Sequence, residues 1–150
     1  MTLSAHEASL LQSCLAAIQE AYQSEILPPS VEAALYQPDS AKDLPDHQAV
    51  EYTQELRTFR GEHSKHIQRW IQSLANALIQ SPVQWQLPAE EADLFLMIIN
   101  DHRLYRAAEF NIADADMETP IDQISQPDKR IALLEIHFLA WFIELLLREM

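Results

Sequence analysis

Apolar residues recur at helical intervals along most of the chain. In the first segment they lie three or four positions apart: Leu11, Leu15, Ile18 and Tyr22. This spacing places them on one face of an α-helix, and Ser4 to Glu7 has the spacing of an N-terminal capping box. We therefore expect a first helix from about Ala5 to Gln23, ended by Pro28-Pro29.

Prolines separate the next two segments. Ser30 to Tyr36 is long enough for one or two helical turns, and the polar stretch from Pro38 to Pro45 forms a connector. From Asp46 to Gln80 there is no proline, and the apolar residues keep a mostly helical period. This segment is either one long helix or two helices joined near Arg60-Gly61, because glycine inside a helix costs about 1 kcal/mol relative to alanine.

A short alternating segment, Val83 to Leu87, interrupts the helical pattern. Alternation is typical of a strand, but the rest of the chain offers no obvious pairing partner. We interpret the segment as an extended link or as a strand that pairs in a dimer. Pro88 then suits the first turn of a third helix, in which the apolar residues between Phe95 and Tyr105 lie on one broad face.

The end of the chain combines an acidic stretch with an unusually apolar helix. The segment from Asn111 to Pro127 contains Asp114, Asp116 and Glu118 and no base, so we expect an acidic, mobile, solvated loop that docks on a basic partner. Of the 17 residues 131–147, only three are polar. A helix that is apolar nearly all round lies in the centre of a core or against a partner, so we expect a central C-terminal helix or a homodimer interface.

Composition supports the helical interpretation. The chain has 150 residues, of which 48% are hydrophobic, and this is enough for one domain with its own core. Gly61 is the only glycine and valine occurs three times, which disfavours tight hairpins and β-branched strands. We predict a single all-α domain over residues 1–150, a small bundle of about four main helices with a hydrophobic C-terminal helix.

Charge narrows the class of partner. The formal net charge is −13, from 23 acidic and 10 basic residues, so a nucleic-acid backbone or an anionic membrane would be repelled. Cys14 is the only cysteine, which rules out an intramolecular disulfide and is typical of the cytoplasm. Its place on the apolar side of the first helix predicts a buried, inert thiol. We find no signal peptide and no apolar stretch of about 20 residues, and we expect a cytoplasmic protein.

Several segments together resemble one uncharacterised bacterial family, domain of unknown function two-thousand-seventeen. These segments are Leu3 to Leu15, Leu35-Tyr-Gln-Pro-Asp39, Glu51 to Leu74, Ile99-Asn-Asp-His-Arg-Leu104 and Leu139 to Leu147. The fourth is similar to the family's Leu-Asn-Asp-Leu-Arg-Leu helix motif, with His102 where the family usually has leucine. In the last, Ala140 and Phe142 flank the tryptophan beside which the family usually has glycine. The resemblance implies an all-helical fold and no established activity. Because many members are encoded near components of Clp-type proteolysis and sulfur-carrier metabolism, it also implies a protein partner linked to Clp-type proteolysis.

The polar residues Asn100, Asp101 and Arg103 are the first candidates for a ligand or partner site, and Trp85 is a candidate anchor for a protein contact. Adjacent positions point around a helix, so the three polar residues cannot share one face. The alternative is structural. Asp101 and Arg103 would then bond neighbouring helix ends and orient the bundle, because polar groups near a core need partners.

A metal centre is disfavoured. Glu62, His63 and His66 are spaced so that pairs of them share a helix face, and a further ligand, His102 or His137, would have to come from elsewhere. The Glu-x-x-His pairs of a diiron bundle and the His-Glu-x-x-His motif are both absent from the sequence. We therefore predict no metal and no cofactor.

These observations favour a non-enzymatic interaction or regulatory module that binds another protein through the C-terminal helix or the acidic stretch. Glycine-rich phosphate loops and nucleophile elbows cannot be built with one glycine. The alternative is a small-molecule-binding or enzymatic bundle with a pocket near Asn100, Asp101, Arg103 and a histidine. The module predicts an exposed apolar or charged patch, whereas the enzyme predicts a buried cavity with strongly perturbed pKa values.

Overall fold

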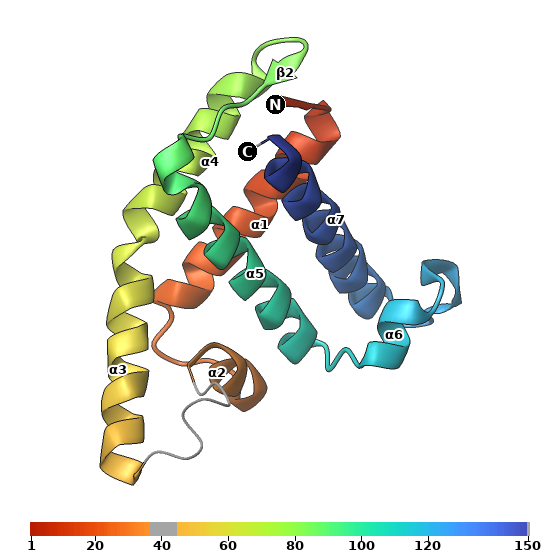
Figure 1. The fold of residues 1–150 in the computed structure, drawn as a ribbon. Coiled ribbons are helices and arrows are strands. Elements are labelled where there is room, and N and C mark those ends of the chain that lie inside the picture. Colours follow the sequence, from red (N-terminus) through yellow and green to blue (C-terminus); the bar gives the residue numbers. More distant parts are fainter. Residues whose placement is uncertain (37–44, 150) are drawn as a thin grey trace.

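The computed structural model describes residues 1–36 and 45–149, which are mostly helical (Figure 1). The elements in chain order are β1 (Thr2–Leu3), α1 (Ala5–Gln23), α2 (Pro29–Tyr36), α3 (Asp46–Glu62), α4 (Ser64–Leu78), β2 (Val83–Gln84), η2 (Ala89–Glu91), α5 (Ala92–Glu109), α6 (Asp114–Glu118), η3 (Ile121–Gln123) and α7 (Pro127–Glu149). The predicted all-α class is confirmed. The expected number of about four main helices is not, because the described residues contain five helices of fifteen residues or more. Of the predicted connector, all but Pro45 lies outside the described residues.

The first helix, α1, begins where the capping box predicts. The backbone N–H of Glu7 donates to Ser4 Oγ, and the Glu7 carboxylate accepts from the Ser4 N–H, both at 3.0 Å. The two bonds satisfy two donors that a helix N-terminus otherwise leaves unpaired. The predicted bounds of α1 are confirmed, and its apolar face, which includes Leu11 and Ile18, is fully buried against neighbouring helices.

The proline-free segment forms two helices rather than one. α3 ends at Glu62 and α4 begins at Ser64, with His63 at the junction. Gly61 lies within α3, two residues before the break. The two helices follow one another along one edge of the molecule (Figure 1). α4 packs along α1, whereas α3 has no fully buried residue.

The alternating segment pairs with the start of the chain. β2 lies antiparallel to β1, with Thr2 opposite Gln84 and Leu3 opposite Val83. The Trp85 N–H also donates to the Met1 carbonyl at 3.0 Å. The interpretation of this segment as an unpaired link or a dimer strand is therefore wrong, because its partner is a strand too short to show any pattern.

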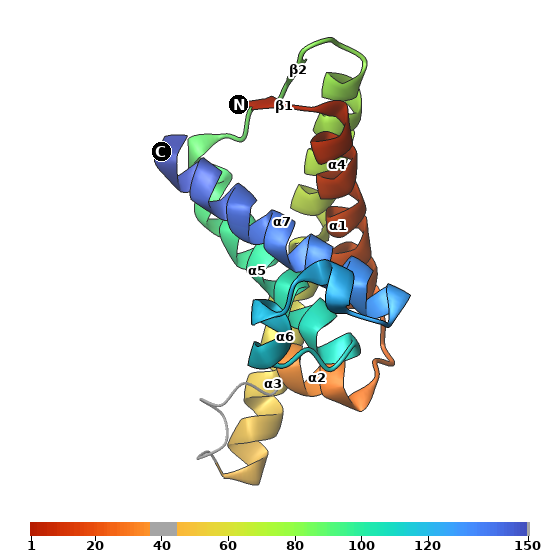
Figure 2. The ribbon, with the colours of Figure 1, turned by 90° about the vertical axis from the view of Figure 1, so that its right-hand side faces the viewer.

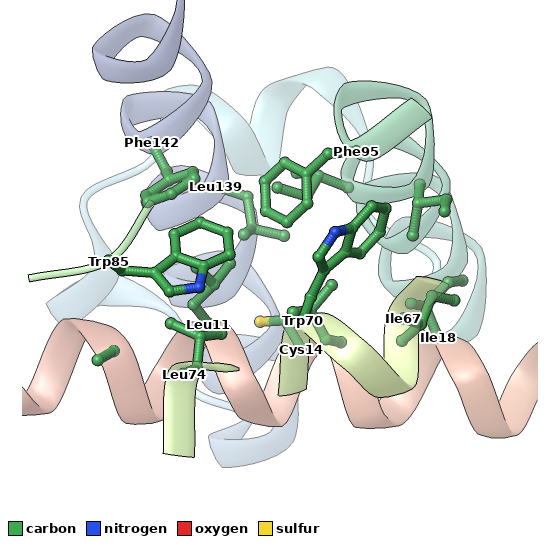
Figure 3. Close-up of a cluster of buried hydrophobic side chains, with 14 of the residues drawn as sticks. Leu11, Cys14, Ile18, Ile67, Trp70, Leu74, Trp85, Phe95, Leu139 and Phe142 are labelled. Atoms are coloured by element: carbon green, nitrogen blue, oxygen red, sulfur yellow. The ribbon is translucent and has the colours of Figure 1, made fainter. Parts of the chain in front are cut away.

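The main core lies where α1, α4, α5 and α7 meet (Figure 3). Its centre is aromatic. The ring centroids of Trp70 and Phe95 are 5.0 Å apart in an edge-to-face arrangement, and Trp85 lies 5.5 Å from Phe95 and 6.4 Å from Phe142. Such pairs add stabilisation beyond the burial of their area. Trp85 Nε1 donates to Ser73 Oγ at 2.8 Å, so the link after β2 is fixed to α4.

The acidic stretch after α5 contains α6 and η3, so the expectation that the whole stretch is a loop is wrong. Asp116 Oδ2 accepts from the Ala113 N–H at 2.8 Å and pairs with Lys129 Nζ at 2.9 Å. These bonds attach α6 to the start of α7. Asp114 and Glu118 remain exposed.

The last helix, α7, lies along one side of the molecule (Figure 2). It packs against α5, α1 and η3, whereas α5 packs against α1, α2, α7 and η2. The expectation that α7 is the central helix is therefore wrong, because both α1 and α5 pack against more elements than α7 does. Among the described residues, no helix has the length and apolar character needed to cross a membrane.

Candidate functional site

Two consecutive polar residues of α5 are buried. Asp101 is 3% exposed and His102 is 1% exposed. Neighbouring residues on an α-helix point about 100° apart because the helix has 3.6 residues per turn. Asp101 and His102 therefore belong to two separate polar clusters, one on each side of α5.

The Asp101 cluster consists of Tyr22, Arg60 and Asp101. Arg60 donates two hydrogen bonds to the Asp101 carboxylate, from Nε to Oδ2 at 2.7 Å and from Nη2 to Oδ1 at 3.2 Å. Tyr22 donates its hydroxyl to Oδ2, and Arg60 Nη1 donates to the Leu35 carbonyl near the end of α2. One carboxylate thus joins α1, α3 and α5, and Arg60 adds α2.

The pKa values of Tyr22 and Arg60, the two donors to Asp101, are both raised. Burial, reinforced by the Asp101 charge, raises the pKa of Tyr22 far above its usual range. Burial opposes the charge of Arg60, but its bonds to Asp101 outweigh this and raise the pKa of Arg60. Both donors therefore stay protonated at neutral pH, and their bonds to Asp101 connect the helices on which they lie.

The His102 cluster consists of Cys14 from α1, His102 and Arg106 from α5, and Glu135 from α7. Cys14 Sγ donates to Glu135 Oε1 at 3.8 Å, and His102 Nε2 lies 3.8 Å from Glu135 Oε2. Arg106 Nε lies 2.8 Å from the same Oε2. Among the described residues, neither ring nitrogen of His102 has a hydrogen-bond partner.

The pKa values of Cys14 and Glu135, the two acids of the His102 cluster, are shifted in opposite directions. Burial, with the Glu135 charge adding to it, raises the pKa of the Cys14 thiol far above its ordinary value. The thiol is therefore neutral and buried, as the sequence predicts. Burial would also raise the pKa of Glu135, but His102 and Arg106 outweigh it and the net shift is downward. Glu135 is thus a carboxylate inside the core.

Three of the predicted site residues do lie together. Asn100, Arg103 and Asp114 line a surface hollow of about 300 Å³, with Met117 and Ile136 beside them. Arg103 Nε is buried there and has no hydrogen-bond partner among the described residues.

The other predicted residues lie elsewhere. Asp101 points away into its own cluster, and Asp116 is paired with Lys129. Glu118 is exposed on α6. Trp85 is only 2% exposed, because its ring completes the aromatic core. The ring of Trp85 therefore lies in the core and not at the surface, where its place in the link suggested it would be.

The possible metal ligands are grouped differently from the sequence expectation. His66 lies beside Glu91, with Nδ1 3.6 Å from Oε1, and Arg69 binds the same carboxylate at 3.2 Å. Within residues 1–36 and 45–149, the trio whose ligand atoms lie within 4.8 Å of one another is Cys14, His102 and Glu135. Cys14 and Glu135 are 121 positions apart, so no motif could have predicted that they meet.

A row of apolar side chains lies on the outer side of α7. The α7 outer stripe comprises Ile131, Leu134, Phe138, Trp141 and Leu145. Ile131, Leu134 and Trp141 are 57%, 47% and 44% exposed, and the other two are partly buried. The centroids of Phe138 and Trp141 are 5.8 Å apart. The stripe is thus a continuous apolar surface that is not covered by the described part of the chain.

Fold and surface define a mostly helical protein of the all-α class, with two buried polar clusters and an uncovered apolar helix face. The chain belongs to the family Domain of unknown function (DUF2017), whose sequence profile matches residues 1–150, and this confirms the resemblance seen in the sequence. No curated protein and no solved structure matches it.

Proposed function

We propose that this chain is a non-enzymatic interaction module that binds a second copy of itself through the α7 outer stripe. The observation that carries the proposal is the exposure of Ile131, Leu134 and Trp141 on one helix face. Contiguous exposed apolar surface rimmed by polar residues marks an interaction site, and aromatic residues are enriched at the centres of such sites.

The stripe is a better docking surface than the acidic stretch. Asp116 is already bound to Lys129 and to the Ala113 N–H, so part of the charge of α6 is neutralised internally. The apolar surface of the stripe is exposed to water, and the binding of a partner would bury it. Burying that area is favourable by roughly 25 cal/mol per Å².

A second copy fits the stripe because of its spacing and its neighbouring charges. The stripe residues alternate three and four positions apart, the interval of a two-helix seam. Beside them, Arg130, His137 and Glu144 stand seven positions apart. An antiparallel pair centred near His137 brings Arg130 of one copy beside Glu144 of the other, twice. A parallel pair would bring the two Glu144 side chains to the same level.

Sedimentation velocity over a concentration series tests the proposal. We expect the wild-type chain to shift from its monomer mass of 17.2 kDa to twice that mass as concentration rises. Leu134→Glu and Trp141→Glu should each hold the chain at the monomer mass. Ile79→Glu is the matched control, because Ile79 is 85% exposed but lies at the end of α4, away from the stripe.

Charge reversal tests the antiparallel register. Glu144→Arg alone should weaken the dimer, and Arg130→Glu with Glu144→Arg should restore it. Arg130 also donates to the Ile124 carbonyl, so thermal melts must show that each variant is folded. A wild-type chain that stays monomeric at every concentration would refute the proposal, and a dimer that Trp141→Glu leaves intact would place the interface elsewhere.

A second candidate function, the binding of a small anionic molecule, is favoured by one observation. Arg103 lines the hollow beside Asn100 with a buried Nε that lacks a partner, and guanidinium groups suit carboxylates and phosphates. Two features favour the interaction module instead. Asp114 brings a negative charge to the same hollow, and Asp101 is engaged by Arg60.

A further inference from the structure

We propose that Cys14, His102 and Glu135 form a binding site for one thiophilic divalent cation of the Zn²⁺ type. The site goes beyond the proposed interaction function and does not depend on it. The three side chains come from α1, α5 and α7 and are 2%, 1% and 6% exposed. A cation bound there would cross-link three helices at the core.

The donor set is of the right kind. Zn²⁺ in proteins is held by cysteine sulfur, histidine nitrogen and carboxylate oxygen, and this cluster supplies one of each. Soft thiolate favours zinc over magnesium or calcium, which prefer oxygen ligands alone. The two carboxylate oxygens of Glu135 face different donors, because Cys14 Sγ lies 3.8 Å from Oε1 and His102 Nε2 lies 3.8 Å from Oε2. Arg106 Nε also contacts Oε2, at 2.8 Å.

The spacing of the donors is close to what a tetrahedral ion requires. Zn²⁺ bonds of about 2.3 Å to sulfur and about 2.0 Å to nitrogen or oxygen place the ligand atoms roughly 3.3 to 3.5 Å apart. The sulfur-to-carboxylate and imidazole-to-carboxylate distances are both 3.8 Å. These two distances end on different carboxylate oxygens, and one donor atom of each residue lies within 4.8 Å of the others. Rotation of the three side chains has to shorten these separations to reach bonding geometry. The fourth position is left for a water molecule.

The imidazole of His102 is the independent sign of a ligand. Buried polar side chains nearly always have hydrogen-bond partners, yet both ring nitrogens of this fully buried residue lack one among the described residues. The Nε2 atom lies 3.8 Å from Glu135 Oε2, which is too long for a hydrogen bond, and one donor atom from each of the three residues lies within 4.8 Å of the others. A bound cation would supply the partner that Nε2 lacks.

Charge balance is also consistent with a divalent ion. Binding breaks the Cys14 S–H bond, forms an S–Zn bond and releases one proton to solvent, because only the thiolate is a zinc ligand. The thiolate and Glu135 then neutralise the two charges of the ion. The charge of Arg106 is balanced by Glu109, whose carboxylate lies 3.2 Å from Nη1. Because binding releases a proton, it should weaken as pH falls.

Cobalt substitution tests the site. The full chain is treated with a chelator, dialysed and titrated with Co²⁺. We expect one equivalent per chain, a thiolate-to-cobalt charge-transfer band in the near ultraviolet, and loss of that band when Zn²⁺ is added. The melting temperature should rise with Zn²⁺. No band and no change in melting temperature for the wild-type chain would overturn the proposal.

Variants separate this site from surface histidines. Cys14→Ser and His102→Leu, which preserve side-chain size approximately, should each remove the band and the Zn²⁺-dependent stabilisation. His6→Asn is the matched control, because His6 is an exposed histidine of α1, the helix that carries Cys14, and lies outside the cluster. Circular dichroism must show that the variants are helical. If His102→Leu fails to fold, Cys14→Ser together with the wild-type titration decides the question. A band that survives Cys14→Ser would also overturn the proposal.

Discussion

Asp101 places a carboxyl group in a site where 3% of its surface is exposed. A charge is tolerable in a core only when it is paired and fully hydrogen-bonded, and Arg60 and Tyr22 supply both conditions. The structural interpretation of Asp101 that the sequence left open therefore has a physical basis. Sequence reasoning identified the residue, but it could not identify Arg60, which lies 41 positions away on another helix.

Replacing Asp101 should cost more stability than replacing any of its exposed neighbours. Asp101→Asn removes the charge and leaves Arg60 unpaired at a site where its side chain is 13% exposed. Loss of one partner from such a buried pair costs about 3 to 5 kcal/mol. Urea unfolding measures the effect. Asn100→Ala, an exposed change one position earlier, should stay within about 0.5 kcal/mol, and equal losses for the two variants would contradict the structural role.

The elements that local signals specify are those that the sequence predicted correctly. α1 has a capping box at Ser4 and prolines after its end, and its predicted and observed bounds agree. The segments that depend on distant contacts were not predictable in the same way. β2 is a strand because Thr2 and Leu3 pair with it, and α6 is anchored because Lys129 reaches Asp116. Hydrophobic periodicity carries no information about either contact.

Gly61 offers a test at the scale of the element. It lies in α3, two residues before the junction at His63, and a Cβ added there would meet nothing within 4 Å. Gly61→Ala should therefore stabilise the protein by about 0.5 to 1 kcal/mol, because alanine loses less backbone entropy in a helix. Thermal or urea unfolding measures the gain. Gln54→Gly, an exposed change in the same helix, should cost about 1 kcal/mol.

The opposite result would change the account of the junction. Destabilisation by Gly61→Ala would mean that the break between α3 and α4 needs the freedom of glycine, as the sequence allowed. The structure instead places the junction at His63, whose backbone remains in the right-handed helical region (φ −84°, ψ −4°).

At the scale of the whole molecule, the two unusual features are the exposed apolar stripe on α7 and the two polar clusters buried in an otherwise apolar core. The net charge of −13 could be counted from the sequence, and a negatively charged surface disfavours binding to a nucleic-acid backbone. The two buried clusters were not readable, because each is assembled from helices far apart in the chain. Both clusters include residues of α5, so ion pairs as well as apolar contacts connect α5 to α3 and to α7.

The carboxylate of the second cluster should make the stability of the molecule depend on acid pH. Glu135 faces Cys14 from α1 and His102 and Arg106 from α5, and the latter two lower its pKa in the folded state. A lowered folded pKa means that its contribution to stability is complete above the unfolded value of about 4.3. That contribution is lost as pH falls through the folded value, because the unfolded chain then binds the proton more readily.

Glu135→Gln isolates this contribution. Near neutral pH the variant should be less stable than wild type by about 2 kcal/mol, the typical worth of hydrogen bonds to a charged group. The difference between the two unfolding free energies should stay constant down to about pH 5 and shrink below about pH 4.3. Urea unfolding across pH, with chelator present so that no bound cation contributes, measures it. Repeating the pair of measurements with His102→Leu separates the part due to the imidazole from the part due to Arg106. A difference that grew as pH fell would mean that Glu135 is protonated in the folded core, and it would remove the reason for treating it as a carboxylate.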